Sequence, residues 1–145
     1  MAVPAAAAPA PPRVHVHTSQ QAVRWGDMDA LGHVNNTLYF RYMEQARSEW
    51  IHERVEGGGE DPGQGTVLVQ ATCDFLAPLT YPSSLEVRMY LGEPGRSSCM
   101  TYYEIATSGR LCATGTAKIV WVDMATGKSS PIPARVAALA RTATP

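Results

Sequence analysis

Two acidic residues stand two positions apart, just before the start of a helical pattern. Asp27 and Asp29 lie within residues 24–50, RWGDMDALGHVNNTLYFRYMEQARSEW. A carboxylate beside a helix N-terminus meets backbone N–H groups that have no partner within the helix. Such N–H groups can hold the negative charge that develops when a carbonyl is attacked. The segment therefore indicates chemistry at an acyl carbon, with one of the two acids acting as nucleophile or as general base for water.

The residues that follow the two acids can supply further donors. The backbone N–H groups around His33, Val34 and Asn35 lead into the helix and are candidates for polarising the carbonyl. His33 could add a side-chain donor or orient water, although a lone His in a turn is often structural. Of Asn35 and Asn36, we expect one to cap the helix and the other to line the site. Tyr39 could line an acyl or aryl pocket or belong to the core.

A helix is predicted from residue 37 to about residue 55. Tyr39, Met43, Ala46 and Trp50 recur at spacings of four, three and four, and the three glycines at 57–59 can end the helix. Alternating patterns predict strands near residues 15–25, 66–77, 84–92, 97–107 and 111–123, and a short helix is expected over residues 134–140. This order predicts an α+β fold in which an antiparallel sheet packs on the helix. Because apolar residues lie on several sides of the helix, we expect the sheet to curl around it.

Three segments, GDMDALGHVNN, MEQARSEW and DFLAPLTYPSSLEV, resemble hotdog-fold acyl-CoA thioesterases of the 4-hydroxybenzoyl-CoA thioesterase type. The similarity covers about residues 14–123. It implies a hotdog fold, in which a five-stranded antiparallel sheet wraps around one long central helix and two subunits pair sheet to sheet. It also implies hydrolysis of an acyl-CoA or aryl-CoA to a free carboxylic acid and CoA, with no cofactor and with active sites at the subunit interface.

The resemblance also implies roles for particular residues. It matches Asp27 to the catalytic carboxylate, with Asp29 as the second candidate. A backbone N–H at Gly65 or Thr66 would be a further oxyanion donor, near the site of the partner subunit. Each acid has a structural alternative, since Asp27 can cap a turn and Asp29 can fix the loop through an Asx-turn. Two other functions remain open: a hotdog hydratase or dehydratase acting on acyl thioesters, and a non-catalytic module that binds acyl thioesters.

Composition excludes several classes of protein. The chain has twelve Lys and Arg and thirteen Asp and Glu, so its net charge is −1. It lacks the excess of positive charge that favours nucleic acid or an anionic membrane as a partner. No apolar run approaches the ~20 residues of a membrane span. His15 and His17 share a strand face, but no acid or Cys at ligand spacing accompanies them, so no metal is expected.

The chain is expected to form one domain over residues 13–145, preceded by a disordered Ala- and Pro-rich tail over residues 1–12 that lacks the pattern of a secretory signal. Cys73, Cys99 and Cys112 are odd in number and lack CxxC spacing, which favours buried, reduced thiols. We therefore expect a cytoplasmic protein. A homodimer or a dimer of dimers is expected from the resemblance, because a β-rich chain would otherwise expose its sheet edges.

Overall fold

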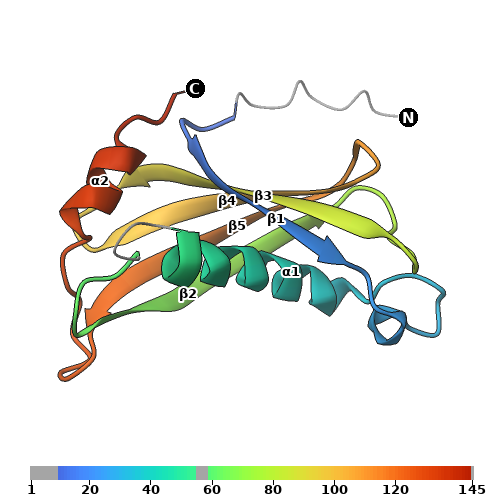
Figure 1. Cartoon of the computed structure of the whole chain (residues 1–145), viewed down its shortest axis with the longest axis horizontal. Coiled ribbons are helices and arrows are strands. Elements are labelled where there is room, and N and C mark those ends of the chain that lie inside the picture. The colour runs from blue at the N-terminus through green and yellow to red at the C-terminus, as the bar shows by residue number, and fades with distance from the viewer. Residues whose placement is uncertain (1–9, 55–58, 145) are drawn as a thin grey trace, which may run out of the picture.

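The computed structural model describes residues 10–54 and 59–144. These residues form a single five-stranded sheet, one long helix and one short helix (Figure 1). The elements follow one another as β1 (Val14–Ala22), α1 (Asn36–Glu49), β2 (Gln64–Phe75), β3 (Ser84–Pro94), β4 (Ser98–Thr107), β5 (Arg110–Asp123) and α2 (Ala134–Ala140).

All neighbouring strands are antiparallel, and their order across the sheet is β1-β3-β4-β5-β2. Figure 1 shows α1 lying along one face of the sheet, with its N-terminal end far from α2. The predicted α+β class and the hotdog arrangement of a sheet around a central helix are confirmed. Because β1 and β2 are the two edges, the chain enters α1 from one edge strand and leaves it towards the other.

The core forms between α1 and the strand positions that alternate inward. Leu85, Val87, Met89 and Leu91 of β3 are fully buried, as their alternation predicts. The inward set of β5 is also buried and consists of Cys112, Ala113, Gly115, Ala117, Ile119 and Trp121. The sheet therefore presents one continuous apolar face to the helix.

Because Gly115 has no side chain, it leaves a depression in this face of the sheet beneath α1. A Cβ atom at this position would collide with the sulfur of Met43 and would lie 3.1 Å from the carbonyl oxygen of Thr72. Met43 is 2% exposed. The missing side chain at residue 115 thus lets the side chain of Met43 pack directly on the backbone of β5.

The start of α1 is set by Asn35, whose Oδ1 accepts hydrogen bonds from the backbone N–H of Thr37 at 2.9 Å and from its hydroxyl at 2.6 Å. The helix is shorter than the predicted span of residues 37–55. It ends at Glu49, and the chain continues as a π-helical turn over Trp50–Arg54. A helical sequence period does not distinguish i→i+4 from i→i+5 bonding within one last turn, which explains the difference.

Of the three glycines expected to end the helix, Gly57 and Gly58 lie outside the described residues. The third, Gly59, is buried, and its N–H donates to the carbonyl of Ile51 at 2.7 Å. Its own carbonyl accepts a hydrogen bond from the indole N–H of Trp121, also at 2.7 Å. The chain after the helix is therefore held against both the helix and β5.

Strand β1 stops at Ala22, three residues before the predicted end, because Trp25–Asp27 form a 3-10 turn. The other strand boundaries differ from prediction by a few residues at most, and α2 has its predicted bounds. Strand β2 does not alternate along its first half: Val67, Leu68 and Val69 are 43%, 49% and 55% exposed. An edge strand with three successive exposed apolar side chains is a surface suited to pairing with another chain.

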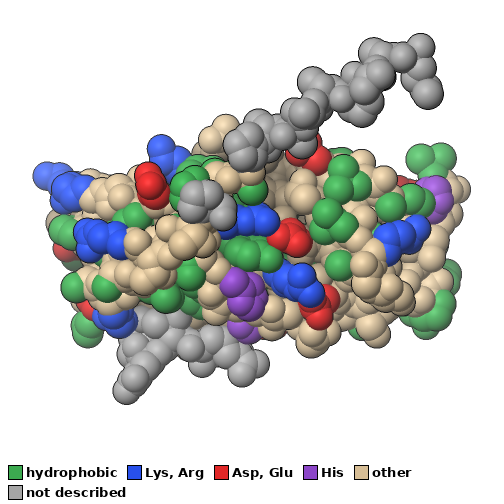
Figure 2. Space-filling model, turned by 90° about the horizontal axis from the view of Figure 1, so that it is seen from above, with side chains coloured by type: hydrophobic (Ala, Val, Ile, Leu, Met, Phe, Trp, Pro, Cys, Tyr) green, Lys and Arg blue, Asp and Glu red, His purple; other side chains and the backbone are tan. Residues whose placement is uncertain are grey.

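The remaining expectations concern the surface and the thiols. Cys99 and Cys112 are buried, Cys73 is half-buried, and all three are free thiols. On the face seen in Figure 2, basic and acidic side chains are interspersed rather than gathered by sign. No helix among the described residues has the length and hydropathy needed to cross a bilayer. The predicted disorder of the tail concerns residues that are mostly outside the described range.

Candidate active site

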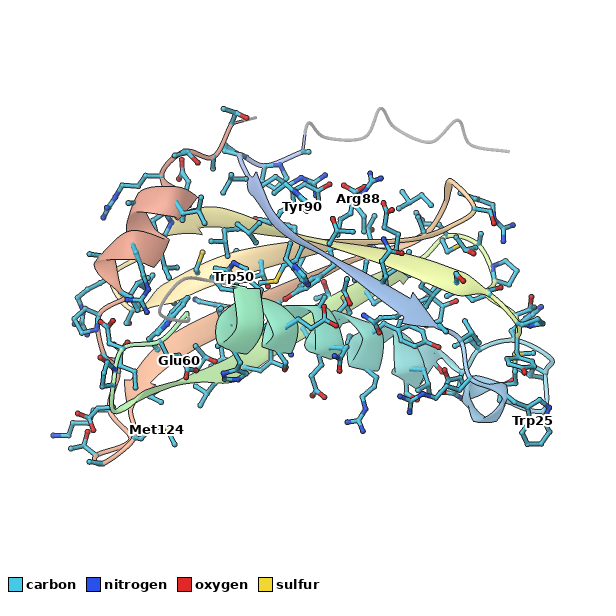
Figure 3. The ribbon with its side chains drawn as sticks, in the orientation of Figure 1. Trp25, Trp50, Glu60, Arg88, Tyr90 and Met124 are labelled. Atoms are coloured by element: carbon cyan, nitrogen blue, oxygen red, sulfur yellow. The ribbon has the colours of Figure 1, made fainter. Side chains whose placement is uncertain are left out.

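The connection from β1 to α1, residues 23–35, carries both acids, and we call it the site loop. It lies at one end of the molecule, marked in Figure 3 by Trp25, whose indole points away from the body of the protein and is 78% exposed. The loop closes on itself through a hydrogen bond from the N–H of Asp29 to the carbonyl of His33 at 3.0 Å. Gly32 reverses the chain between them at φ 81°, a conformation that glycine adopts without strain.

Asp27 is an anchor of the site loop. The residue is 9% exposed, and its Oδ2 accepts hydrogen bonds from the hydroxyl of Tyr42 at 2.7 Å and from the N–H of Arg24 at 2.9 Å. Its backbone carbonyl accepts the N–H of Asn35 at 2.9 Å. Burial, and next the hydrogen bond to Asp27, raise the pKa of Tyr42, so that the phenol stays a donor. Both the carboxylate and the backbone of Asp27 thus tie the loop to α1.

Asp29 is held differently and is more accessible. Oδ1 accepts the N–H of Leu31 at 2.9 Å, which is an Asx-turn, and Oδ2 accepts the side-chain amide of Asn35 at 3.1 Å. The residue is partly exposed. Each oxygen has one protein donor and keeps a further lone pair for water or substrate. Asp29 is therefore oriented by the residue that caps α1 without being enclosed.

The amide groups at the start of α1 are not equivalent. The N–H of Val34 donates to the carbonyl of Leu79 at 2.8 Å, and that of Asn35 is used by Asp27. Within the described residues, the N–H groups of His33 and Asn36 have no acceptor. Asn36 is the first residue of α1, where the helix dipole adds to the positive potential. Two free N–H groups therefore remain at the helix start, that of His33, which the sequence suggested, and that of Asn36, one residue beyond the three suggested.

A cavity of about 400 Å³ opens beside this helix start. Its lining joins the site loop and α1 to the segment that follows β2, and comprises His33, Val34, Asn36, Tyr39, Phe75, Leu76, Ala77 and Pro78. Tyr39 meets Phe75 edge to face, with ring centroids 4.9 Å apart. A cavity lined mainly by apolar side chains and by the first residue of a helix suits an acyl group whose carbonyl reaches the helix.

Gly65 and Thr66 lie elsewhere in this chain. They begin β2, whereas Phe75 at the end of the same strand lines the cavity. The Cβ position of Gly65 adjoins Met124, which Figure 3 shows at the end of the molecule opposite to Trp25. Within one chain these two residues therefore do not join the site.

The structure brings most of the predicted site residues together, but it also adds residues that the sequence did not single out. Asp27, Asp29, His33, Asn35 and Asn36 all lie within or directly after the site loop. Sequence reasoning missed the buried hydroxyl of Tyr42 and the wall formed by residues 75–78. For Tyr42 a signal existed, because a tyrosine on the buried side of a helix needs a partner for its hydroxyl.

No group of three or more metal-ligating side chains occurs among residues 10–54 and 59–144. His15 contacts the hydroxyl of Thr18 at 2.8 Å, and His17 contacts the carboxylate of Glu49 at 2.6 Å. The two histidines thus have separate partners, one along the strand and one on α1.

A central helix wrapped by a five-stranded antiparallel sheet defines a hotdog fold. In agreement, residues 23–139 match the family model of the thioesterase-like superfamily, and the chain belongs to that family. The expectation of a thioester hydrolase is thereby confirmed at the level of the family.

Similar proteins are consistent with this membership. A solved structure of the PA2801 protein of Pseudomonas aeruginosa, a candidate thioesterase, is 38% identical over 86% of this chain and 98% of that chain, with a TM-score of 0.79. The BH1999 gentisyl-coenzyme A thioesterase is 28% identical over 85% and 98% of the two chains, with a TM-score of 0.74. An Aquifex aeolicus protein named as a candidate esterase is 34% identical over 79 residues, which are 53% of this chain and 62% of that protein.

Proposed function

We propose that the protein hydrolyses an acyl-CoA or aryl-CoA thioester to the free acid and CoA at the start of α1. The observation that carries the proposal is the free N–H of Asn36, a residue that lines the 400 Å³ cavity and directly follows the loop that holds both carboxylates. This N–H would hold the carbonyl oxygen as negative charge develops on it. The acyl group would then lie between Tyr39 and the wall of residues 75–78.

The geometry favours Asp29 over Asp27 as the acting carboxylate. Asp27 was the first choice from the sequence, but it is only 9% exposed and its Oδ2 is occupied by Tyr42 and Arg24, which leaves Oδ1 alone for substrate or water. Asp29 keeps free lone pairs and is partly exposed. It would attack the carbonyl itself or take a proton from the attacking water. In either route the C–S bond breaks and CoA leaves as a thiolate, which is a good leaving group and needs no Ser-His-Asp triad. In the first route, water then hydrolyses the anhydride between Asp29 and the acyl group to release the free acid.

His33 and Asn35 would assist in different ways. His33 is exposed and lines the cavity, so that it can contact the leaving thiolate or a bound water. Asn35 would orient Asp29 through the 3.1 Å hydrogen bond while it caps α1. Substitution of Asn35 therefore changes both the helix start and the acid.

A dimer formed through β2 would complete the site. Two β2 strands paired antiparallel bring the start of one strand beside the end of the other. Gly65 and Thr66 of one copy would then approach the Phe75 end of the other, where their N–H groups can join the oxyanion donors. The exposed Val67, Leu68 and Val69 support this pairing.

The aromatic wall supports an aryl or a medium-sized acyl group as the substrate. Phe75 and Tyr39 present ring surfaces to the cavity, and the gentisyl-CoA thioesterase to which this chain is similar has an aromatic substrate by name. Three free thiols fit a reducing compartment such as the cytoplasm.

The test is thiol release from a panel of short, long and aromatic acyl-CoAs, with wild type, Asp29→Asn and Asp27→Asn compared at equal folded concentration. We expect Asp29→Asn to lose at least about 100-fold in kcat, as expected when a general base is removed, with its melting temperature retained. Any loss of kcat in Asp27→Asn should be explained by the lower stability of that variant. Activity that survives in Asp29→Asn but disappears in a fully folded Asp27→Asn would reverse the assignment. Absence of release from every ester, together with hydration of crotonyl-CoA, would replace hydrolysis by the hydratase reaction.

A further inference from the structure

A second cavity of about 230 Å³ lies between α1 and β2, further along the helix than the candidate active site. Phe40, Glu44 and Arg47 line it from α1, and Leu68 and Ala71 line it from β2. Their spacings of four and three residues place the three helical side chains on one face of α1. This face turns towards the exposed edge of the sheet.

The guanidinium of Arg47 is the unusual group in this cavity. Arg47 is only 9% exposed, and it donates one hydrogen bond, from Nη1 to the hydroxyl of Tyr103 at 3.2 Å. Among residues 10–54 and 59–144 it has no carboxylate within ion-pair distance and no second acceptor. No fully buried side-chain nitrogen in this part of the chain lacks a partner. The guanidinium nitrogens of Arg47 that lack a partner are therefore accessible, and Arg47 lines the cavity.

A buried cation without an anion is costly, and the cavity leaves room for one. The nearest acid on the same face, Glu44, is more than half exposed and pairs with Arg41 at 3.3 Å at the surface. An ion pair of two such exposed side chains is weak and is easily exchanged for a better one. The face thus carries an accessible carboxylate and, one helical turn away, a guanidinium that lacks a carboxylate.

In a two-fold symmetric dimer, the spacing of Glu44 and Arg47 makes this face of α1 complementary to itself. If two β2 strands pair antiparallel, the symmetry axis is normal to the sheet, so both α1 helices stay on the same side and run antiparallel. Each contact between the helices then occurs twice: if one residue of the first helix contacts a different residue of the second, the symmetry-related pair makes the same contact. Glu44 and Arg47, three positions apart on the exposed flank, would form two equivalent ion pairs when the axis passes at the level of Gln45 and Ala46.

We propose that this face of α1 is an interface with a second copy of the chain, in which Glu44 of each copy enters the other's cavity and pairs with Arg47. The proposal rests on the β2 dimer of the proposed function and identifies the groups that fix its register. The apolar residues around Arg47, namely Phe40, Met43, Leu68, Ala71 and Ala117, exclude water from the pair. Exclusion of water strengthens the ion pair and makes a mismatched pair costly.

Two charge reversals test the proposal by complementation. Because Arg41 also lines the cavity, Glu44→Arg gives a chain with three positive residues around it, and Arg47→Glu gives a chain with two negative residues beside Arg41. We expect each variant alone to show a dimer dissociation constant raised roughly 100-fold or more, as like charges would meet at both contacts. An equimolar mixture should form a heterodimer, since both contacts then join opposite charges. Sedimentation velocity and native mass spectrometry measure the species, and circular dichroism checks that each variant is folded.

Glu93→Arg is the matched control, because Glu93 is exposed on β3, far from β2 in the sheet order. It should leave the dimer unchanged. If Arg47→Glu does not fold, the double variant Glu44→Arg/Arg47→Glu replaces it and should dimerise while Glu44→Arg alone does not. Dimerisation of Glu44→Arg with wild-type affinity, or failure of the mixture to associate, would overturn the proposal. Thiol release by a wild-type monomer would overturn the interface while leaving the hydrolase assignment intact.

Discussion

Replacing Asn36 by proline removes one hydrogen-bond donor from the candidate site and little else. Asn36 is the first residue of α1, its side chain has no hydrogen bond among the described residues, and its N–H has no acceptor there. Proline is favoured at the first helical position because its ring presets the helical φ. The preceding residue, Asn35, has φ −59° and ψ 138°, a conformation that a residue before proline readily adopts. We therefore expect Asn36→Pro to fold with nearly unchanged stability.

The catalytic effect should be large by comparison. Removal of one oxyanion-hole donor costs about 100- to 1,000-fold in kcat, or about 3–4 kcal/mol of transition-state stabilisation. The assay is thiol release from the best acyl-CoA of the panel, measured as kcat and KM separately. Asn36→Ala is the matched control, because it removes the side chain and keeps the N–H, and it should lose less than about tenfold. Equal turnover of the Pro and Ala variants, both fully folded, would refute the role of this amide.

Two further predictions concern the buried contacts of α1. Tyr42→Phe should destabilise the protein by about 2 kcal/mol, the usual value of a hydrogen bond to a carboxylate, and lower the melting temperature by about 5 °C. A melting temperature equal to that of the wild type would contradict the anchoring of Asp27 by this hydroxyl. Burial alone would raise the pKa of Glu49, but its hydrogen bonds, led by that from His17, bring the pKa below its usual 4.5. Glu49→Gln should therefore lower the free energy of unfolding above about pH 4.5, and this loss should shrink as the pH falls further. Urea unfolding of both proteins across this pH range measures the difference. A loss that does not change with pH would contradict the prediction.

The sequence predicted the fold well because its patterns are local. Alternation in β3 identified Leu85 to Leu91 as one face, and all four apolar members of that face are buried. The long helix was visible from its period, but its π-helical last turn was not, since both bonding patterns present almost the same face over five residues.

The candidate site was predicted in part, for a different reason. The chain segment with Asp27 and Asp29 is contiguous, so the sequence shows both acids, but it does not show which carboxylate is covered. That distinction depends on the hydroxyl of Tyr42, fifteen residues away and brought in by the packing of α1. The cavity wall at residues 75–78 likewise depends on where β2 ends relative to the helix start. Both are tertiary facts with no local sequence pattern.

Gly115 connects the packing of the core to the size of the substrate. The cavity proposed for the acyl group is bounded by α1 and by the segment that follows β2, so its width depends on how closely the helix approaches the sheet. The glycine sets that approach through Met43, without lining that cavity itself. Replacing Met43 by a small residue and Gly115 by a large one at the same time would therefore tilt or raise the helix. Such a pair of substitutions offers a way to adjust acyl selectivity from inside the core. Selectivity in this fold can thus be tuned by a residue that the substrate never touches.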